Sequence, residues 1–169
     1  MPDLFTSLLP ILIRVFIVVL MLVGGALFAF SAFVMAALAR VPAGEGVRVM
    51  QQINKTVFTP WFMVPFFLTL PLGLGAIVVA LLHTDRPWWP VLLIAGVLSS
   101  AGVFVVTAAG NVPLNNRLER VDADSPELTP EARELWQHYL RVWTRLNHVR
   151  VIASVAGVVC LAETLRLLA

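Results

Sequence analysis

The chain has 169 residues, of which 59% are hydrophobic and 13% charged, and its formal net charge is +2. Soluble domains carry roughly a quarter charged residues, so this composition excludes an ordinary soluble protein. The basic residues flank apolar runs, and the net charge therefore does not indicate nucleic-acid binding. The single cysteine, Cys160, has no partner for an internal disulfide. We interpret residues 1–169 as one integral membrane domain.

The first apolar run extends from residue 4 to residue 39 and contains one charged residue, Arg14. It is longer than the roughly 20 residues that cross a bilayer and far longer than a signal peptide. We expect residues 4–13 at the interface and residues 15–39 across the membrane, with the Arg14 side chain extended to the headgroups. An inward-facing, functional Arg14 is the alternative.

A polar connection, residues 40–59, contains an apolar pattern with spacings of three and four. This pattern predicts a short amphipathic interfacial helix over residues 46–57. Its apolar positions are Val47, Met50, Ile53 and Val57. Gln51 and Asn54 are neighbours on this helix. Either they point together at the mouth of the bundle, or they stay solvated on the polar face.

Residues 60–82 form the second predicted span, which contains Pro65 and Pro71. Proline lacks an N–H group and its ring clashes with the carbonyl four residues earlier. We therefore expect a kinked or locally open helix, whose freed carbonyls need partners inside the bundle.

Residues 91–110 form the third predicted span, and we expect Pro113 to end its helix near Asn111. A polar connection, residues 111–148, follows. Within it, Thr129 and Pro130 are typical of the N-cap and first position of a helix. We expect that helix to continue as one rod to the end of the fourth span, residues 149–168.

The predicted fold class is an all-α membrane protein. It is a four-helix transmembrane bundle with a short amphipathic interfacial helix and a long last helix. Nine of the twelve Lys and Arg residues lie in or next to the two long connections. The positive-inside rule therefore places these connections in the cytoplasm and both termini outside, in a plasma membrane of bacterial type.

Polar residues near the third and fourth spans form the candidate site. One stripe of the last helix has spacings of four, three, four and three and faces one way. It comprises Trp136, Leu140, Trp143, Asn147 and Arg150. At the membrane boundary, Asn147 and Arg150 can meet the amides that end the third helix, which are Asn111, Asn115 and Asn116. Amides and a guanidinium suit a carbonyl or anionic oxygen. Alternatively, the amides join helices and Arg150 binds lipid headgroups.

Histidines offer a second kind of chemistry. His138 and His148 are ten residues apart on the last helix, about 15 Å, so we do not expect them to share a metal ion. The sequence has none of the usual metal-ligand spacings, and we predict no metal site. The cofactor is left open. His148 is a candidate general base, and an exposed interfacial histidine is the alternative.

Four segments together resemble the anthrone oxygenase-like family, whose bacterial members are usually described as a domain of unknown function. They are Phe28-Ala-Phe-Ser-Ala-Phe-Val-Met-Ala-Ala-Leu38, Met50-Gln-Gln-Ile-Asn54, Gly110-Asn-Val-Pro-Leu-Asn-Asn-Arg117 and Trp143-Thr-Arg-Leu-Asn-His-Val-Arg150. Ala36 departs from the family, where proline is expected in many relatives. This affects the end of the first helix and not the proposed site.

Fungal relatives oxidise anthrones to anthraquinones with O2. The resemblance implies a substrate surrounded by Gln51, Asn54, Asn111, Asn115, Trp143, Asn147 and Arg150. It also implies that Arg150 and the amides stabilise an enolate while His148 takes the proton. An electron-rich enolate can react with oxygen without a bound metal.

The sequence therefore predicts a membrane-embedded, oxygenase-like protein acting on a hydrophobic aromatic molecule that resembles an anthrone or a quinone. The alternative is a non-catalytic membrane subunit or a protein that binds lipid or small molecules. A transporter is less favoured, because no inverted repeat is seen and the spans contain one acidic residue, Glu163. The expected partners are a hydrophobic small molecule and membrane lipid, with a homo-oligomer allowed and no nucleic acid.

Overall fold

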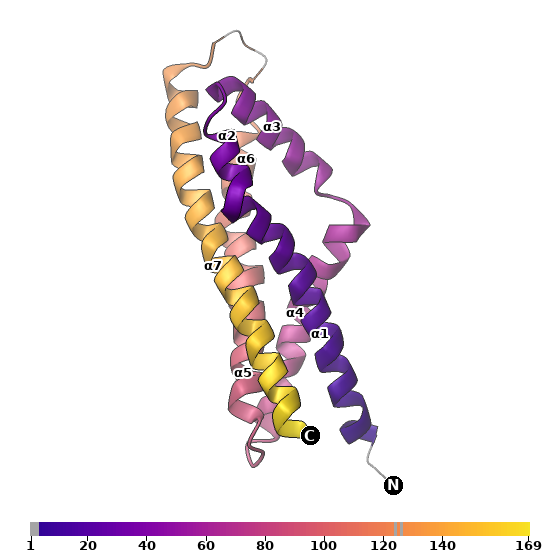
Figure 1. Cartoon of the computed structure of the whole chain (residues 1–169). Helices are drawn as coiled ribbons and strands as arrows, with labels where there is room; N and C mark the ends of the chain where they lie inside the picture. Colours follow the sequence, from indigo (N-terminus) through magenta and orange to yellow (C-terminus); the bar gives the residue numbers. More distant parts are fainter. Residues whose placement is uncertain (1–3, 124, 126) are drawn as a thin grey trace.

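Four long helical rods lie side by side in the computed structural model, which describes residues 4–123, 125 and 127–169 (Figure 1). The second rod is α4 (Pro60–Leu82) and the fourth is α7 (Pro130–Leu168). The other two rods contain π-helical segments, labelled η. They comprise α1 (Leu4–Ala29), η1 (Phe30–Val34) and α2 (Met35–Leu38), then α5 (Trp89–Val97), η2 (Leu98–Val105), η3 (Thr107–Asn111) and α6 (Val112–Leu118).

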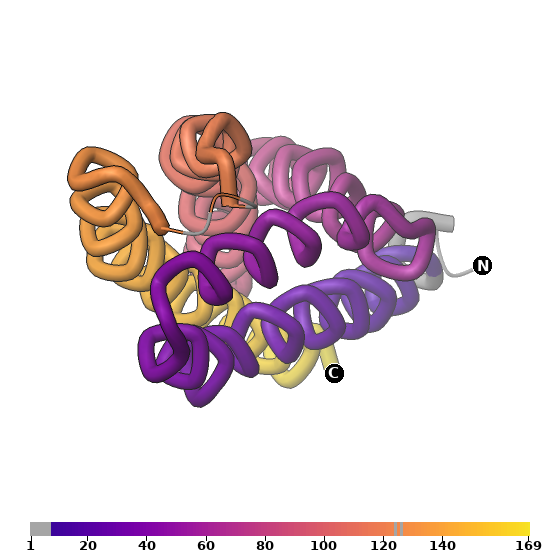
Figure 2. Tube along the Cα trace, turned by 90° about the horizontal axis from the view of Figure 1, so that it is seen from above, coloured from indigo at the N-terminus to yellow at the C-terminus, as the bar shows by residue number. Residues whose placement is uncertain are grey.

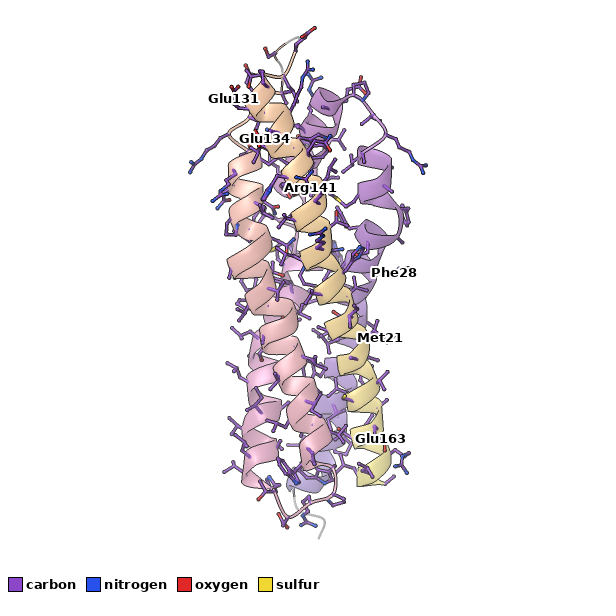
Figure 3. All side chains as sticks on the ribbon, turned by 90° about the vertical axis from the view of Figure 1, so that its left-hand side faces the viewer. Met21, Phe28, Glu131, Glu134, Arg141 and Glu163 are labelled. Atoms are coloured by element: carbon purple, nitrogen blue, oxygen red, sulfur yellow. The ribbon has the colours of Figure 1, made fainter. Side chains whose placement is uncertain are left out.

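Each rod is long and apolar enough to cross a membrane. Exposed apolar side chains such as Met21 and Phe28 occupy the middle of the bundle, whereas Glu131, Glu134 and Glu163 lie toward its two ends (Figure 3). This distribution matches an apolar slab between two aqueous phases. The chain is an integral membrane protein, and the predicted fold class is confirmed.

The beginning of α1 and the end of α7 lie at one end of the bundle, and both long connections lie at the other (Figure 1). The last helix is one continuous rod from Pro130 to Leu168, as predicted. Its N-cap is Thr129, whose hydroxyl accepts a hydrogen bond of 3.2 Å from the Ala132 amide. This bond satisfies one of the donors that a helix N-terminus leaves free.

The exposed face of α7 changes character halfway along the helix. Between Glu131 and His148 its exposed side chains are charged or polar, and from Val149 to Ala162 they are apolar. The change falls where the fourth span is predicted to begin. The first half of α7 therefore suits water or headgroups, and the second half suits lipid.

The amphipathic helix predicted for the first connection is α3 (Ala43–Thr56), which crosses the upper end of the bundle (Figure 2). Its apolar face buries Val47 and Met50. On its polar face, Gln51 donates to the carbonyls of Leu118 and Val121, both at 2.9 Å. These bonds fasten α3 to the end of the third rod.

Pro65 and Pro71 do not open the second rod as the sequence predicted. α4 is α-helical through both Pro65 and Pro71, so the expected local opening is absent. The irregular stretches are the π-helical segments of the first and third rods instead. A side-chain bond joins α4 to the third rod at Thr69, whose carbonyl accepts from Ser99 Oγ at 2.8 Å, although neither proline frees this carbonyl.

The prediction that Pro113 ends the third helix is also wrong, because that helix continues to Leu118. In η3 the Val112 amide bonds the Thr107 carbonyl, five residues earlier. This wider turn immediately precedes the proline. We attribute the tolerance of Pro113 to it, since a π-turn changes which carbonyl faces the proline ring.

The interior contains two apolar clusters separated by polar residues. One cluster, around Leu20, Leu92 and Leu161, fills the middle and lower parts of the bundle. The other, around Met50 and Trp136, lies under α3. Between them lie four residues that we call the polar layer, namely Thr107, Asn111, Asn147 and Arg150.

Close contact between α4 and α5 depends on glycine. A Cβ atom added at Gly96 would lie 2.6 Å from the Gly73 carbonyl oxygen and 2.8 Å from Ile77 Cγ1. The first of these is backbone and cannot rotate away. The two helices therefore approach closely enough that position 96 has no room for a side chain.

We expect Gly96→Ala to destabilise the protein by about 1–3 kcal/mol, because the added methyl group forces α4 and α5 apart. The measurement is thermal unfolding of the purified protein in detergent.

Gly75→Ala, on the exposed face of α4, is the matched control, since nothing lies within 4 Å of a Cβ there. It should be neutral or mildly stabilising. Equal melting temperatures for the two variants would contradict the close contact.

Candidate functional site

Arg150 is the charged residue of the polar layer, and it is 4% exposed. Its Nη2 donates to Asn147 Oδ1 at 2.6 Å, and its Nη1 donates to Thr107 Oγ1 at 3.2 Å. The guanidinium carbon lies 5.1 Å from the centre of the Trp143 ring. The guanidinium Nε is buried and has no hydrogen-bond partner. Arg150 is thus held at both terminal nitrogens, while its Nε–H group is left without a partner.

Asn147 connects Arg150 to the first rod. Its Nδ2 donates to the Leu27 carbonyl and to Ser31 Oγ, both at 2.7 Å. Leu27 lies in the last turn of α1, three residues before the π-helical segment η1 begins. Asn147 is fully buried, so its amide acts as a bridge between α7 and α1.

The amides of the third rod differ in their roles. Asn111 is buried and donates from Nδ2 to the Trp143 carbonyl at 3.2 Å, which ties η3 to α7. Asn115, one turn later, accepts two hydrogen bonds at Oδ1. They come from Tyr139 Oη at 2.8 Å and from Trp143 Nε1 at 2.9 Å.

The buried stripe of α7 contains Tyr139 and not Leu140, which the sequence analysis had assigned to it. Tyr139 is fully buried and stacks between Trp136 and Trp143, with ring centroids at 5.7 and 6.0 Å. Both residues fit a helical period, and hydrophobicity alone favoured leucine. The aromatic spacing of three and four from Trp136 to Trp143 was the signal that could have identified Tyr139.

A cavity of about 720 Å³ lies under α3 and reaches the polar layer. Aromatic side chains form much of its wall, among them Phe30, Phe58, Phe62, Phe66 and Phe67. Apolar walls with a few fixed polar groups are typical of small-molecule sites, and the volume suits a drug-sized or tricyclic molecule. Polar and charged lining residues are Asn54, Lys55, Thr59, Thr107, Asn115, Asn116, Glu119 and Arg150.

The cavity divides the predicted site residues into two groups. Four of them line it, which are Asn54, Asn115, Trp143 and Arg150. The other four are not among its lining residues: Gln51, Asn111, Asn147 and His148. Gln51 fastens α3, while Asn111 and Asn147 support the wall from behind.

His148 lies on the exposed face of α7. Its Nδ1 is 2.9 Å from Ser31 Oγ, and the same hydroxyl accepts the hydrogen bond from Asn147. His148 is therefore connected to Arg150 indirectly, by hydrogen bonds that pass through Ser31 and Asn147.

Comparison with protein families matches residues 48–160, about two thirds of the chain, to the family described as anthrone oxygenase. The chain belongs to the anthrone oxygenase family. Comparisons with curated proteins and with solved structures find no match. The family resemblance predicted from the four sequence segments is confirmed.

The region shared with the anthrone oxygenase family begins inside α3 and ends at Cys160 on α7. It contains all eight predicted site residues and most of the cavity wall. The part of the wall contributed by the first rod, at Ala26 and Leu27 of α1 and Phe30 of η1, precedes the match.

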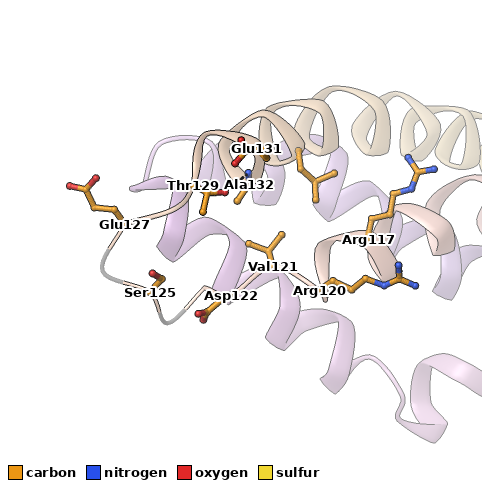
Figure 4. A pocket seen from close by; sticks show the side chains of 10 residues that line it. Arg117, Arg120, Val121, Asp122, Ser125, Glu127, Thr129, Glu131 and Ala132 are labelled. Atoms are coloured by element: carbon orange, nitrogen blue, oxygen red, sulfur yellow. Dashed lines mark hydrogen bonds between the residues drawn. The ribbon is translucent and has the colours of Figure 1, made fainter.

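A second hollow, of about 360 Å³, lies where α6 leads into α7 (Figure 4). Basic and acidic side chains both line it, among them Arg117, Arg120, Asp122, Glu127 and Glu131. It lacks the aromatic wall of the larger cavity. Within the described part of this anthrone oxygenase family member, no three His, Cys, Asp or Glu side chains are grouped to hold a metal ion.

We expect Asn147→Leu to destabilise this family member by about 2–4 kcal/mol. The change removes the hydrogen bond to the Leu27 carbonyl and leaves part of the Arg150 guanidinium buried without a partner. Denaturation of the purified protein in detergent measures the effect.

Asn116→Leu is the control, because Asn116 is exposed on α6. It should change stability by less than about 0.5 kcal/mol. A similar loss in both variants would show that Asn147 is not a structural bridge.

Proposed function

We propose that the protein is a membrane-embedded oxygenase that uses O2 to oxidise a hydrophobic aromatic molecule that resembles an anthrone or a quinone. Membership of the anthrone oxygenase family supports the reaction class. The observation that carries the proposal is the aromatic-walled cavity of about 720 Å³ with the buried Arg150 guanidinium in its lining. A flat tricycle fills such a space, and a fixed positive charge attracts an ionised oxygen.

Several side chains that line the cavity can donate hydrogen bonds. Buried nitrogens without partners include Arg150 Nε and Asn54 Nδ2. Both residues line the cavity, as does Asn115. A carbonyl oxygen gains negative charge when the neighbouring carbon acid loses a proton, and fixed donors stabilise that charge without reorganising. We propose that Arg150, supported by Asn147 and Asn111, stabilises the enolate.

The reaction balances without another reductant. The ring CH2 group of an anthrone loses one proton, and the electron pair of that C–H bond passes to the enolate. Reaction with O2 then converts the carbon to C=O. One oxygen atom enters the quinone and the other leaves as water with both hydrogens. The carbon loses four electrons and O2 gains four.

Two residues are candidates for the proton acceptor. His148 remains the proposal from the sequence, acting through Ser31. Glu119 lines the cavity directly and pairs with Lys55 at 2.8 Å. The Glu119 carboxylate could take the proton directly from a bound substrate, whereas His148 would need a relay through Ser31. Glu119→Gln and His148→Gln distinguish them, since the base should lose turnover and the other residue should not.

One observation favours a non-catalytic alternative. Gln51, Asn111 and Asn147 each donate to backbone carbonyls, which is how amides join helices. Under this reading the protein binds a lipid or an aromatic molecule and does not oxidise it. The alternative uses the same cavity, and turnover separates the two.

The decisive measurement is oxygen uptake and quinone formation by membranes that contain the protein and are supplied with emodin anthrone. Wild-type membranes should exceed matched empty membranes. Arg150→Lys should lower the rate about 10- to 100-fold at equal protein abundance, because lysine lacks the guanidinium fork.

Arg145→Lys on the exposed face of α7 is the matched control and should retain the wild-type rate. No quinone formation above the empty membranes would reject the oxygenase in favour of the binding protein.

We also propose that the protein lies in a plasma membrane of bacterial type with both long connections in the cytoplasm. Its partners would be the aromatic substrate and surrounding lipid, and a homo-oligomer is compatible with the exposed apolar faces. The cation distribution supports this orientation.

Cysteine labelling tests the orientation in a Cys160→Ser background. In intact cells, a membrane-impermeant maleimide should modify Ala169→Cys at the end of α7. It should reach Glu134→Cys, on the exposed face near the start of α7, only after permeabilisation. The opposite pattern would invert the proposed orientation.

A further inference from the structure

We infer that Tyr139 and Trp143 fix the amide of Asn115 so that it offers only N–H groups to the cavity. Asn115 thereby becomes a specificity determinant that selects ligands carrying an acceptor oxygen. This inference rests on the proposal that the cavity is the substrate site. It adds a positioning residue, Tyr139, which does not line the cavity.

Hydrogen-bond chemistry fixes which way the amide faces. Trp143 Nε1 lies 2.9 Å from Asn115 Oδ1, and an indole nitrogen can only donate. The atom that it meets must therefore be the oxygen. Tyr139 Oη donates to the same oxygen at 2.8 Å. Turning the amide over would place an NH2 group against the indole N–H and lose that bond, whereas the present orientation accepts both donors at Oδ1.

The two donors are themselves immobile. Tyr139 is fully buried and Trp143 is 5% exposed. Their rings lie 6.0 Å apart at an interplanar angle of 21°, and Trp136 stacks on the other side of Tyr139. Buried, stacked aromatic rings have few alternative rotamers, so the orientation of the amide is set before any ligand arrives.

The amide nitrogen of Asn115 is left for the ligand. It has no hydrogen-bond partner among the described residues, whereas the oxygen already has two. Asn115 lines the cavity together with Arg150 and Asn54, whose Nε and Nδ2 atoms are also unpartnered. Those two nitrogens have almost no accessible surface, so the Asn115 nitrogen is the unpaired donor left for a ligand in the cavity.

A cavity wall with a fixed donor distinguishes ligands that carry an acceptor oxygen from ligands that carry none. A carbonyl or ionised phenol accepts hydrogen bonds from such a wall, whereas a tricycle without oxygen leaves the donors unpaired. A site built to hydrogen-bond an oxygen rejects the analogue that lacks it more strongly than an apolar site rejects a change of shape. We therefore expect anthraquinone to bind more tightly than anthracene, which has the same three rings and no oxygen.

The test measures binding of anthraquinone and of anthracene to the full chain in lipid nanodiscs. The readout is quenching of tryptophan fluorescence, corrected with protein-free discs. Wild type should prefer anthraquinone by about tenfold or more. Tyr139→Phe keeps the stacked ring and removes the hydroxyl donor. It should reduce the preference severalfold and leave anthracene affinity unchanged.

Asn115→Leu should reduce the preference at least as much as Tyr139→Phe does, because the amide donor itself is removed. Gln52→Leu, which replaces an exposed amide on α3 that does not line the cavity, should retain the preference. An unchanged preference in Tyr139→Phe, or equal loss of both ligands, would overturn the role of Tyr139 while leaving the cavity as the substrate site. If wild type bound neither tricycle, the proposed function would fail together with this inference.

Discussion

A guanidinium buried between two apolar clusters needs partners for its N–H groups, and Arg150 obtains them from its own helix and from the third rod. It bonds Asn147 on its own helix and Thr107 on the third rod, and Asn147 extends the chain of bonds to Leu27 and Ser31 on the first rod. An unpaired charge at this depth would cost several kcal/mol. The helices therefore meet in the register that keeps these bonds intact, and the π-helical segments η1 and η3 lie at this level.

The same bonds explain why a cavity can exist here. A bundle of apolar helices tends to close on itself, because interiors pack to high density. At the polar layer, Asn111 and Asn147 use their hydrogen bonds to hold the third and first rods against α7, while α3 spans the upper end. The wall is thus rigid where Arg150 and Asn115 face inward, and rigidity is what a donor needs if it is to stabilise developing charge. The structural amides of Asn111 and Asn147 lie behind the cavity wall, and they hold in place the residues that line the cavity.

Much of the fold followed from the sequence because its signals are local. Apolar run length indicated the four rods, and Thr129 with Pro130 indicated the start of α7. The prolines misled, since their effect depends on neighbouring turns that only the folded bundle defines. Pro113 follows a π-turn, and Pro65 and Pro71 stay within a regular helix. Within the candidate site, the sequence found Arg150, Asn115, Trp143 and Asn54. It could not tell lining residues from supporting ones, because that difference depends on which helix face meets the cavity. Tyr139 was missed for the same reason.

The cavity wall includes Phe58, in the turn between α3 and α4, whose side chain is 75% exposed. Nearby Trp61 is 91% exposed. Aromatic side chains at such positions settle at the boundary between headgroups and hydrocarbon. An oily tricycle dissolves in that same boundary, so the concentration that governs occupancy is its mole fraction in the membrane. Adding protein-free vesicles at constant total ligand would lower the mole fraction of the ligand in the membrane. Apparent binding would weaken, although the affinity of the protein is unchanged.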